Sequence, residues 1–226
     1  MRGIIFDLDD TLYPYEHFRI SGFGAVARHV EGRDGVSALR AFSALCRARL
    51  SRPGCEFQAL AEDLRLPPAR VDEWTTVFRN HTPDLALTPS VRAMLAGLRA
   101  NGWRIGILTN GAPATQRRKL AALDVIPLVD AHVCAEDVMP GGKPAVACFD
   151  AVLAALGTTA RATVHAGDDL LADVHGAAAA GLRTVRVRSV SYPGSCPGDA
   201  DLVVNRVEEV AYAAAHLIPE DLAHVA

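Results

Sequence analysis

The stretch that decides the fold reads GIIFDLDDT and occupies residues 3–11. The apolar residues 3–6 predict a short strand that is buried on both faces of a parallel sheet. Ligands bind beyond the carboxyl ends of such strands, and Asp7 and Asp9 follow at that point. Side chains two apart in an extended chain point the same way, so both carboxylates can face one crevice while Leu8 faces protein. Two carboxylates in one small site indicate a bound cation or an acid/base pair that shares a proton.

The same acids also suit a simpler interpretation, in which Asp9, Asp10 and Thr11 form a polar turn that caps the next helix. Alternation along the chain points Asp10 away from the side of Asp9, which favours a turn or capping role for Asp10. The remainder of the chain decides between the two interpretations for the other acids.

Composition places the chain among folded globular proteins. Of its 226 residues, 50% are hydrophobic and 22% are charged, and the formal net charge is −3. This balance argues against disorder and against a global basic field for nucleic acid or anionic membranes. The five cysteines lack C-x-x-C spacing and are expected to be reduced thiols. The first strand begins at once and no apolar run approaches the length of a membrane span, so the cytoplasm is the expected compartment.

A long helical segment follows the first strand. Residues 13–85 show helical periodicity, with breaks at 51–54 and 67–68, and we predict that they form an inserted all-helical cap. The α/β catalytic core then comprises residues 1–12 and 86–226. An insert of this length exceeds an ordinary connection and is typical of a lid or a substrate domain.

Strands and helices alternate through the rest of the chain. Thr88-Pro89 and Pro113 begin helices, and Gly157 and Gly181 end helices. A loop rich in proline and glycine, Tyr192–Gly198, separates the last two strands. The predicted strands after the first are residues 104–108, 131–135, 162–166, 184–187 and 202–204. This alternation predicts a doubly wound, Rossmann-like parallel sheet. His132 and His165 lie inside two of the strand runs, where packed core histidines are more common than ligands.

The strand ends carry groups that complement a phosphoryl group. A phosphoryl transition state is stabilised by a divalent metal, an ammonium group and hydroxyl or amide donors, and one carboxylate can attack phosphorus while a second protonates the leaving oxygen. The residues that follow the predicted strands supply each of these groups: Asp7, Asp9, Thr109, Asn110, Lys143, Asp168, Asp169 and Asp173.

These residues also resemble the four motifs of the haloacid dehalogenase superfamily of phosphohydrolases, in the same order. The first motif resembles DLDDT at residues 7–11, and the second resembles LTNG at 108–111. The third resembles Lys143-Pro144, and the fourth resembles GDDLLAD at 167–173. The helical insert after the first motif is similar to the cap of the helical-cap (subfamily I) phosphatases.

The resemblance implies a catalytic or metal-binding role for three of the acids. Asp7 would be the nucleophile that forms an aspartyl phosphate, and it would also bind Mg²⁺. Asp9 would be general acid and then general base, with its backbone carbonyl on the metal. Asp168 would be a further metal ligand.

The resemblance also implies supporting roles. Thr109 and the backbone amide of Asn110 would hold the phosphoryl oxygens, and Lys143 would neutralise charge on the nucleophile and the phosphoryl group. Asp173 would bind the metal through water or orient Lys143. Asp169 stands where the family often has serine or asparagine, and its role stays open between a helix cap and a supporting acid.

The implied activity is Mg²⁺-dependent hydrolysis of a small phosphorylated metabolite by a monomer or homodimer, with a nucleotide, phosphoglycolate or a sugar phosphate as the substrate. A 2-haloacid dehalogenase or a phosphosugar mutase on the same core is the alternative, although dehalogenases typically lack an acid at the position of Asp9. A receiver-like or phosphate-binding module without enzymatic activity is the alternative from another class. The helical insert disfavours the receiver.

Overall fold

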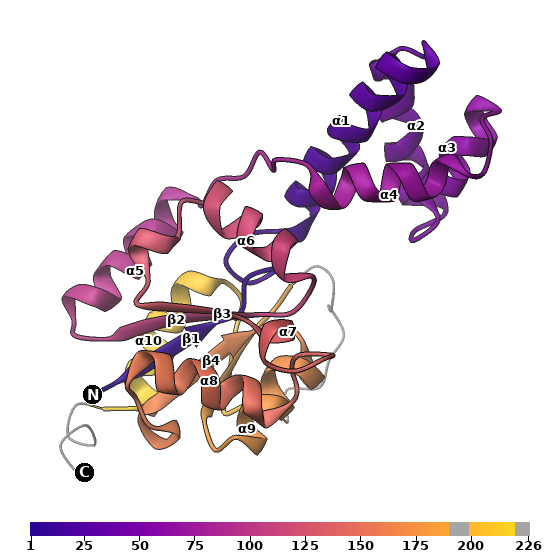
Figure 1. Ribbon diagram of the computed structural model, residues 1–226. Coiled ribbons are helices and arrows are strands. Elements are labelled where there is room, and N and C mark those ends of the chain that lie inside the picture. The colour runs from indigo at the N-terminus through magenta and orange to yellow at the C-terminus, as the bar shows by residue number, and fades with distance from the viewer. Residues whose placement is uncertain (190–198, 220–226) are drawn as a thin grey trace. The chain divides into compact units, whose positions relative to one another are not determined.

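The computed structural model describes residues 1–189 and 199–219. The predicted loop Tyr192–Gly198, which includes Cys196, lies outside these residues. The chain divides into two compact units, one formed by Met1–Tyr15 with Ala86–Ala226 and the other by Glu16–Leu85. Figure 1 shows the first unit as a sheet between helices and the second as helices only.

The first unit contains a six-stranded sheet in which all strand pairs are parallel, in the order β3-β2-β1-β4-β5-β6. The strands are β1 (Gly3–Phe6), β2 (Arg104–Thr109), β3 (Ala131–Cys134), β4 (Thr163–Gly167), β5 (Arg183–Val187) and β6 (Leu202–Val204). The predicted doubly wound sheet is therefore confirmed. All four residues of β1 are buried, as expected for a central strand that is covered on both faces.

The strand order places a crevice beside the first motif. The chain runs from β1 outward through β2 and β3, and then returns to the opposite side of β1 with β4. Phe6 lies opposite Ile107 on β2 and Ala166 on β4, so the residues after these three strands emerge side by side. In open parallel sheets, ligands bind at such a reversal of strand order.

Helices cover both faces of this sheet. Helices α8 and α9 pack on one face, and α5 and α10 pack on the other. A buried cluster that includes Ile5, Leu108 and Phe149 joins β1 and β2 to α8. The helices of this unit are α5 (Pro89–Ala100), α6 (Pro113–Ala122), α7 (Ala135–Val138), α8 (Val146–Leu156), α9 (Gly176–Ala179) and α10 (Val210–Leu217), and the shorter turns are η1 (Ile126–Leu128), η2 (Ala160–Ala162), η3 (Leu170–His175) and η4 (Val207–Glu209).

Local sequence signals set several helix ends. The hydroxyl of Thr88 accepts a hydrogen bond from the Val91 backbone N–H at the start of α5, with Pro89 in the first turn. Gly157 ends α8 in the left-handed conformation, with φ of 64°. The predicted helix after the fourth motif instead begins with the π-helical turn η3 before α9.

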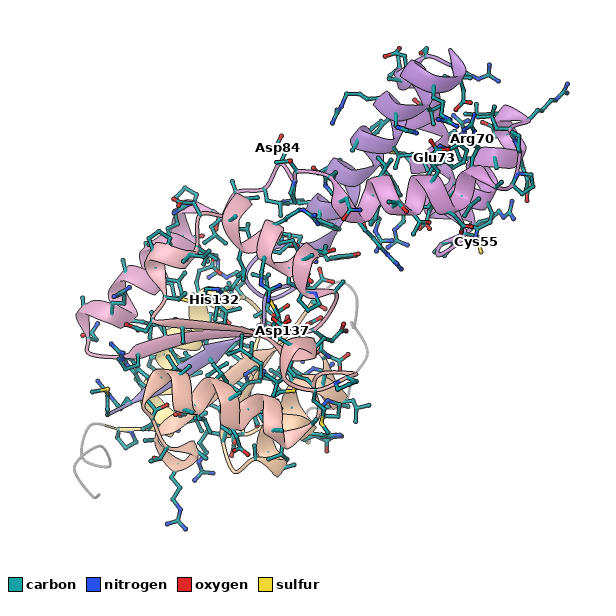
Figure 2. All side chains as sticks on the ribbon, viewed as in Figure 1. Cys55, Arg70, Glu73, Asp84, His132 and Asp137 are labelled. Atoms are coloured by element: carbon teal, nitrogen blue, oxygen red, sulfur yellow. The ribbon has the colours of Figure 1, made fainter. Side chains whose placement is uncertain are left out.

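The second unit consists of α1 (Tyr15–Asp34, whose first residue belongs to the first unit), α2 (Ala38–Ser51), α3 (Glu56–Leu64) and α4 (Arg70–Asn80). Its own hydrophobic core surrounds the fully buried Trp74. Charged side chains pair on its surface, as Arg70 and Glu73 do on α4 (Figure 2). No helix of the described ranges, in either unit, is long and apolar enough to cross a membrane.

The prediction for His132 was wrong. We expected a packed core histidine, but its side chain is exposed. Strand β3 is an edge strand, and its burial alternates instead of being complete. Figure 2 labels His132 on this outer strand. Sequence periodicity over four residues does not reveal which strand of a sheet lies at the edge.

Gly176 should not tolerate alanine. A Cβ atom there would lie 2.9 Å from the Pro144 Cα and 2.9 Å from the Phe149 ring, so a backbone atom blocks it. We expect G176A to lower the free energy of unfolding by about 1–3 kcal/mol, as measured by urea denaturation. The matched control is G97A on α5, because a Cβ atom at Gly97 meets nothing within 4 Å. G97A should raise the free energy of unfolding by about 0.5–1 kcal/mol. Equal effects in the two variants would contradict the packing argument.

Candidate active site

A polar cavity of about 200 Å³ opens at the carboxyl ends of β1, β2 and β4. Every residue that the four motifs nominate lies on its wall. The lining residues are Asp7, Asp9, Asp10, Thr109, Asn110, Lys143, Asp168, Asp169, Ala172 and Asp173. The fold therefore brings together groups that are spread over more than half of the chain.

The ammonium group of Lys143 lies at the centre of this site. Its Nζ atom is 2.6 Å from Asp7 Oδ1 and 2.6 Å from Asp173 Oδ1, and it donates to the Leu108 carbonyl at 3.0 Å. Burial acts to lower the pKa of Lys143, but Asp173 and Asp7 together raise it above the ordinary value. Lys143 is therefore a permanent cation beside Asp7.

The carboxylate of Asp173 is buried and accepts hydrogen bonds from three groups. Burial acts to raise its pKa, but Lys143 and His165 together lower the pKa below the ordinary value. His165 Nε2 lies 3.0 Å from Asp173 Oδ1, and the Asp169 backbone N–H donates to Asp173 Oδ2 at 3.1 Å. Because burial lowers the pKa of His165, this imidazole is neutral and donates from Nε2. His165 is thus a buried core histidine, as expected, although its Nδ1 atom has no hydrogen-bond partner among the described residues.

The loop that carries Lys143 is anchored by Asn110. The Asn110 side chain accepts from the Lys143 backbone N–H at 2.8 Å and donates to the Lys143 carbonyl at 3.0 Å. This two-way contact ties the loop after β3 to the end of β2. It uses the side-chain amide of Asn110 and leaves its backbone N–H as the group that could meet a ligand.

Asp10 and Asp169 have capping contacts. Asp10 has a left-handed φ of 56°, and its carboxylate accepts from the Tyr15 backbone N–H at 2.9 Å, which agrees with the predicted turn role. The Asp169 carboxylate accepts from the Ala172 backbone N–H at 2.7 Å and caps η3.

Three carboxylates could hold a metal ion. One oxygen from each of Asp7, Asp168 and Asp173 lies within 4.8 Å of the other two. Burial raises the pKa of Asp7 well above its ordinary value, although Lys143 opposes the shift, and burial raises the pKa of Asp168 to about 7. Buried acids of this kind suit a hard divalent cation, which would favour their ionised forms. The residues therefore fit Mg²⁺, and the side chain of Asp9 is not part of this cluster.

The carboxylate of Asp9 has a separate set of partners. Lys119 Nζ lies 2.9 Å from its Oδ1 and 2.7 Å from its Oδ2. Gln116 Nε2 donates to Oδ2 at 3.0 Å, and the Tyr13 hydroxyl donates to Oδ1 at 2.5 Å. Gln116 Nε2 also lies 2.6 Å from the hydroxyl of Thr109.

Sequence reasoning missed Gln116 and Lys119. Both are buried, and they lie on α6 at helical spacing with the buried Leu120 and Leu123. A glutamine and a lysine on a buried helix face, directly after a strand-end motif, were the available signal.

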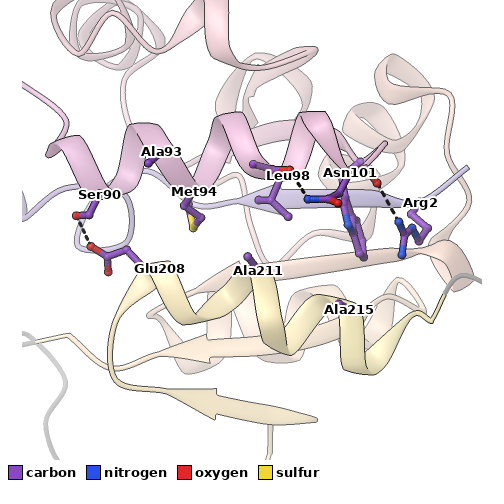
Figure 3. A pocket seen from close by; sticks show the side chains of 11 residues that line it. Arg2, Ser90, Ala93, Met94, Leu98, Asn101, Glu208, Ala211 and Ala215 are labelled. Carbon is purple, nitrogen blue, oxygen red and sulfur yellow. Dashed lines mark hydrogen bonds between the residues drawn. The ribbon is translucent and has the colours of Figure 1, made fainter.

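A larger cavity of about 640 Å³ lies between α5 and α10 and is shown in Figure 3. Its polar groups already pair with protein. Ser90 donates to Glu208 at 2.6 Å, and Arg2 donates to the Asn101 carbonyl at 2.9 Å. A site needs polar groups that converge on a ligand, so the smaller cavity is the candidate active site.

Comparison with known proteins agrees with this choice. A family model described as haloacid dehalogenase-like hydrolase matches residues 1–181, and a second HAD-hydrolase-like model matches residues 140–223. A glyceraldehyde 3-phosphate phosphatase from Methanocaldococcus jannaschii is 28% identical, over 93% of this chain and 95% of its own length. A phosphoserine phosphatase from Thermus thermophilus is 31% identical, over 80% of this chain and 70% of its own length.

A solved structure shares the fold. The 2-haloacid dehalogenase from Pseudomonas syringae superposes with a TM-score of 0.64 at 24% identity, and the match covers 96% of this chain and 99% of the dehalogenase. This likeness supports the sheet topology and does not distinguish a phosphatase from a dehalogenase.

Mg²⁺ binding should weaken as the pH falls. A proton competes with the metal for Asp168, whose pKa is about 7, so the binding form is lost below that pH. We expect the Mg²⁺ dissociation constant, measured by calorimetry, to rise on the order of tenfold from about pH 8 to about pH 6. D168N should bind Mg²⁺ at least about tenfold more weakly at the higher pH. A constant affinity across this range in the unaltered protein would contradict the assignment.

Proposed function

The chain belongs to the haloacid dehalogenase-like hydrolase family, and on that premise we propose that it is a Mg²⁺-dependent phosphatase that hydrolyses small phosphomonoesters through an aspartyl phosphate on Asp7. The observation that carries the proposal is the position of Asp7. Its carboxylate lies in the strand-end cavity beside the ammonium group of Lys143 and the acids that could hold a metal ion. A nucleophile, a charge-neutralising group and a cation site then meet at one point.

In the first step, an Asp7 oxygen attacks phosphorus and the bond from phosphorus to the ester oxygen breaks. Asp9 in its protonated form gives a proton to that leaving oxygen, so an alcohol departs. In the second step, water attacks the phosphorus of the aspartyl phosphate and Asp9 accepts the water proton. The bond from phosphorus to Asp7 breaks, inorganic phosphate leaves, and both acids return to their starting states.

The other lining residues support charge and orientation. Lys143 would neutralise negative charge on Asp7 and the phosphoryl oxygens, and Thr109 with the Asn110 backbone N–H would donate to those oxygens. Asp7 and Asp168, together with the main-chain carbonyl of Asp9, would hold Mg²⁺. When bound, Mg²⁺ would shield the acids from the substrate's charge and polarise the phosphoryl group. Asp173, whose oxygens already accept from Lys143, His165 and Asp169, would mainly orient Lys143.

The proposed substrate is a small phosphorylated metabolite. Relatives that cover most of this chain are named as phosphatases of glyceraldehyde 3-phosphate and phosphoserine, which are both three-carbon esters, and also of phosphoglycolate and ribulose-1,5-bisphosphate. A dehalogenase is the second candidate because the fold is shared. Asp9 favours the phosphatase, because an acid/base is needed to protonate an alcohol and is not needed when halide leaves.

The D7N variant should lose turnover and keep its fold. Asparagine has nearly the same shape as aspartate, but its amide cannot attack phosphorus, so we expect a loss of at least about a thousandfold in kcat. The measurement is Mg²⁺-dependent phosphate release, with circular dichroism to check folding. D150N is the matched control because Asp150 is exposed on α8, away from the cavity, and it should keep the unaltered rate. Substantial phosphatase activity in D7N would refute the nucleophile assignment.

A substrate panel tests the reaction class itself. Glyceraldehyde 3-phosphate, phosphoserine, phosphoglycolate, sugar phosphates and nucleoside monophosphates are assayed with Mg²⁺ and again after chelation by EDTA. We expect phosphate release from at least one three-carbon ester, loss of release in EDTA, and recovery when Mg²⁺ returns. Release of halide from 2-haloacids, with no release of phosphate from any ester, would favour the dehalogenase instead.

A further inference from the structure

The carboxylate of Asp9 meets hydrogen-bond donors on both of its oxygens. An ionised carboxylate has about four lone-pair positions. Here Oδ1 faces the Tyr13 hydroxyl and Lys119, and Oδ2 faces Gln116 and Lys119. All four positions are therefore used, and the donors fix both oxygens of Asp9 in place.

The surroundings of Tyr13 and Lys119 keep both side chains as donors to Asp9. Burial and the neighbouring Asp9 raise the pKa of Tyr13 above its ordinary value, so its hydroxyl keeps its proton. The side chain of Lys119 is only 4% exposed, against 26% for Asp9, and its ammonium lies 4.8 Å from the centre of the Tyr15 ring. Lys119 is thus buried behind the carboxylate, on the side away from solvent, and steadies it from within.

Gln116 connects Asp9 to the phosphate-binding side of the cavity. Its amide nitrogen carries two hydrogens, and one points to Asp9 Oδ2 while the other points to Thr109 Oγ1. The amide must be oriented this way because a carboxylate needs a donor opposite it. Since the Thr109 oxygen accepts from Gln116, the Thr109 hydroxyl hydrogen is directed elsewhere. It donates to the Asn110 carbonyl over a long 3.4 Å, a contact that a phosphoryl oxygen could replace.

We propose that Lys119 and Gln116, on one face of α6, are positioning residues. Lys119 and Gln116 hold the acid/base Asp9 in place, and Gln116 also fixes its position relative to the phosphate-binding Thr109. This inference rests on the proposed phosphatase function and adds to it two residues outside the four motifs. Lys119 acts on proton transfer through Asp9 and touches no reacting atom. Its removal therefore affects an ester according to how much proton donation its leaving group needs.

The experiment compares two esters that form the same aspartyl phosphate. An alkyl phosphate needs a proton on its leaving oxygen, whereas p-nitrophenyl phosphate releases a stable phenolate without one. We expect K119M to lower kcat/KM for the alkyl ester at least about tenfold more than for the aryl ester. The parameter kcat/KM is used because it reports the first chemical step and is independent of the shared hydrolysis step.

The control is R117M, which also removes one positive charge from α6, two residues before Lys119. Arg117 is exposed and pairs with Asp137, so R117M should leave both kcat/KM values unchanged. Q116L is the second variant, and it should also depress the alkyl ester more, because it too removes a donor to Asp9. It provides the test if K119M does not fold, as judged by thermal melting.

Equal losses on the two esters, in whichever of K119M and Q116L folds, would overturn the positioning role and leave the phosphatase function intact. Absence of activity on both esters in the unaltered protein with Mg²⁺ would overturn the proposed function, and the positioning role would fall with it. The two failures are distinguished by the unaltered protein alone.

Discussion

The ammonium group of Lys143 is buried between Asp7 and Asp173, and the arrangement of the strand ends depends on that contact. Buried carboxylates lose hydration and repel one another, so they can share a small volume only with a cation among them. Removing one partner of a buried ion pair typically costs about 3–5 kcal/mol. Asn110 fixes the Lys143 loop, and His165 fixes Asp173. The loops after β1, β2, β3 and β4 thus depend on one another.

Two acids that are two residues apart in one motif have entirely different surroundings. Asp7 is buried with Lys143 among the acids that could hold a metal ion, and Asp9 is partly exposed and contacts Lys119. Because the two lysines come from different parts of the chain, each carboxylate has its own counter-charge. Separate environments are what allow two neighbouring carboxylates to take different chemical roles. The proposed division of roles, with Asp7 as the nucleophile and Asp9 as the acid/base, is consistent with this separation.

The sheet supplies position, and the side chains supply chemistry. Reversal of strand order beside β1 would create a crevice in any doubly wound sheet, and a dehalogenase shares this topology. The chemistry depends on the groups at the crevice, where a second acid, Asp9, is present and is held by Lys119 and Gln116. The fold is therefore compatible with several reactions, and the site favours phosphoryl transfer.

The sequence alone determined the sheet class, the strand bounds to within one residue and the motif residues, because these follow from short-range causes. A short apolar run such as β1, the cap at Thr88 and the left-handed glycine at Gly157 each act over a few neighbouring residues. The tertiary structure decided what depends on strand order and helix orientation. It placed β3 at the edge and exposed His132, and it brought Lys119 to Asp9 across 110 residues of chain. No local pattern encodes such a pairing, because the distance between two side chains so far apart in sequence is set only when the elements between them pack.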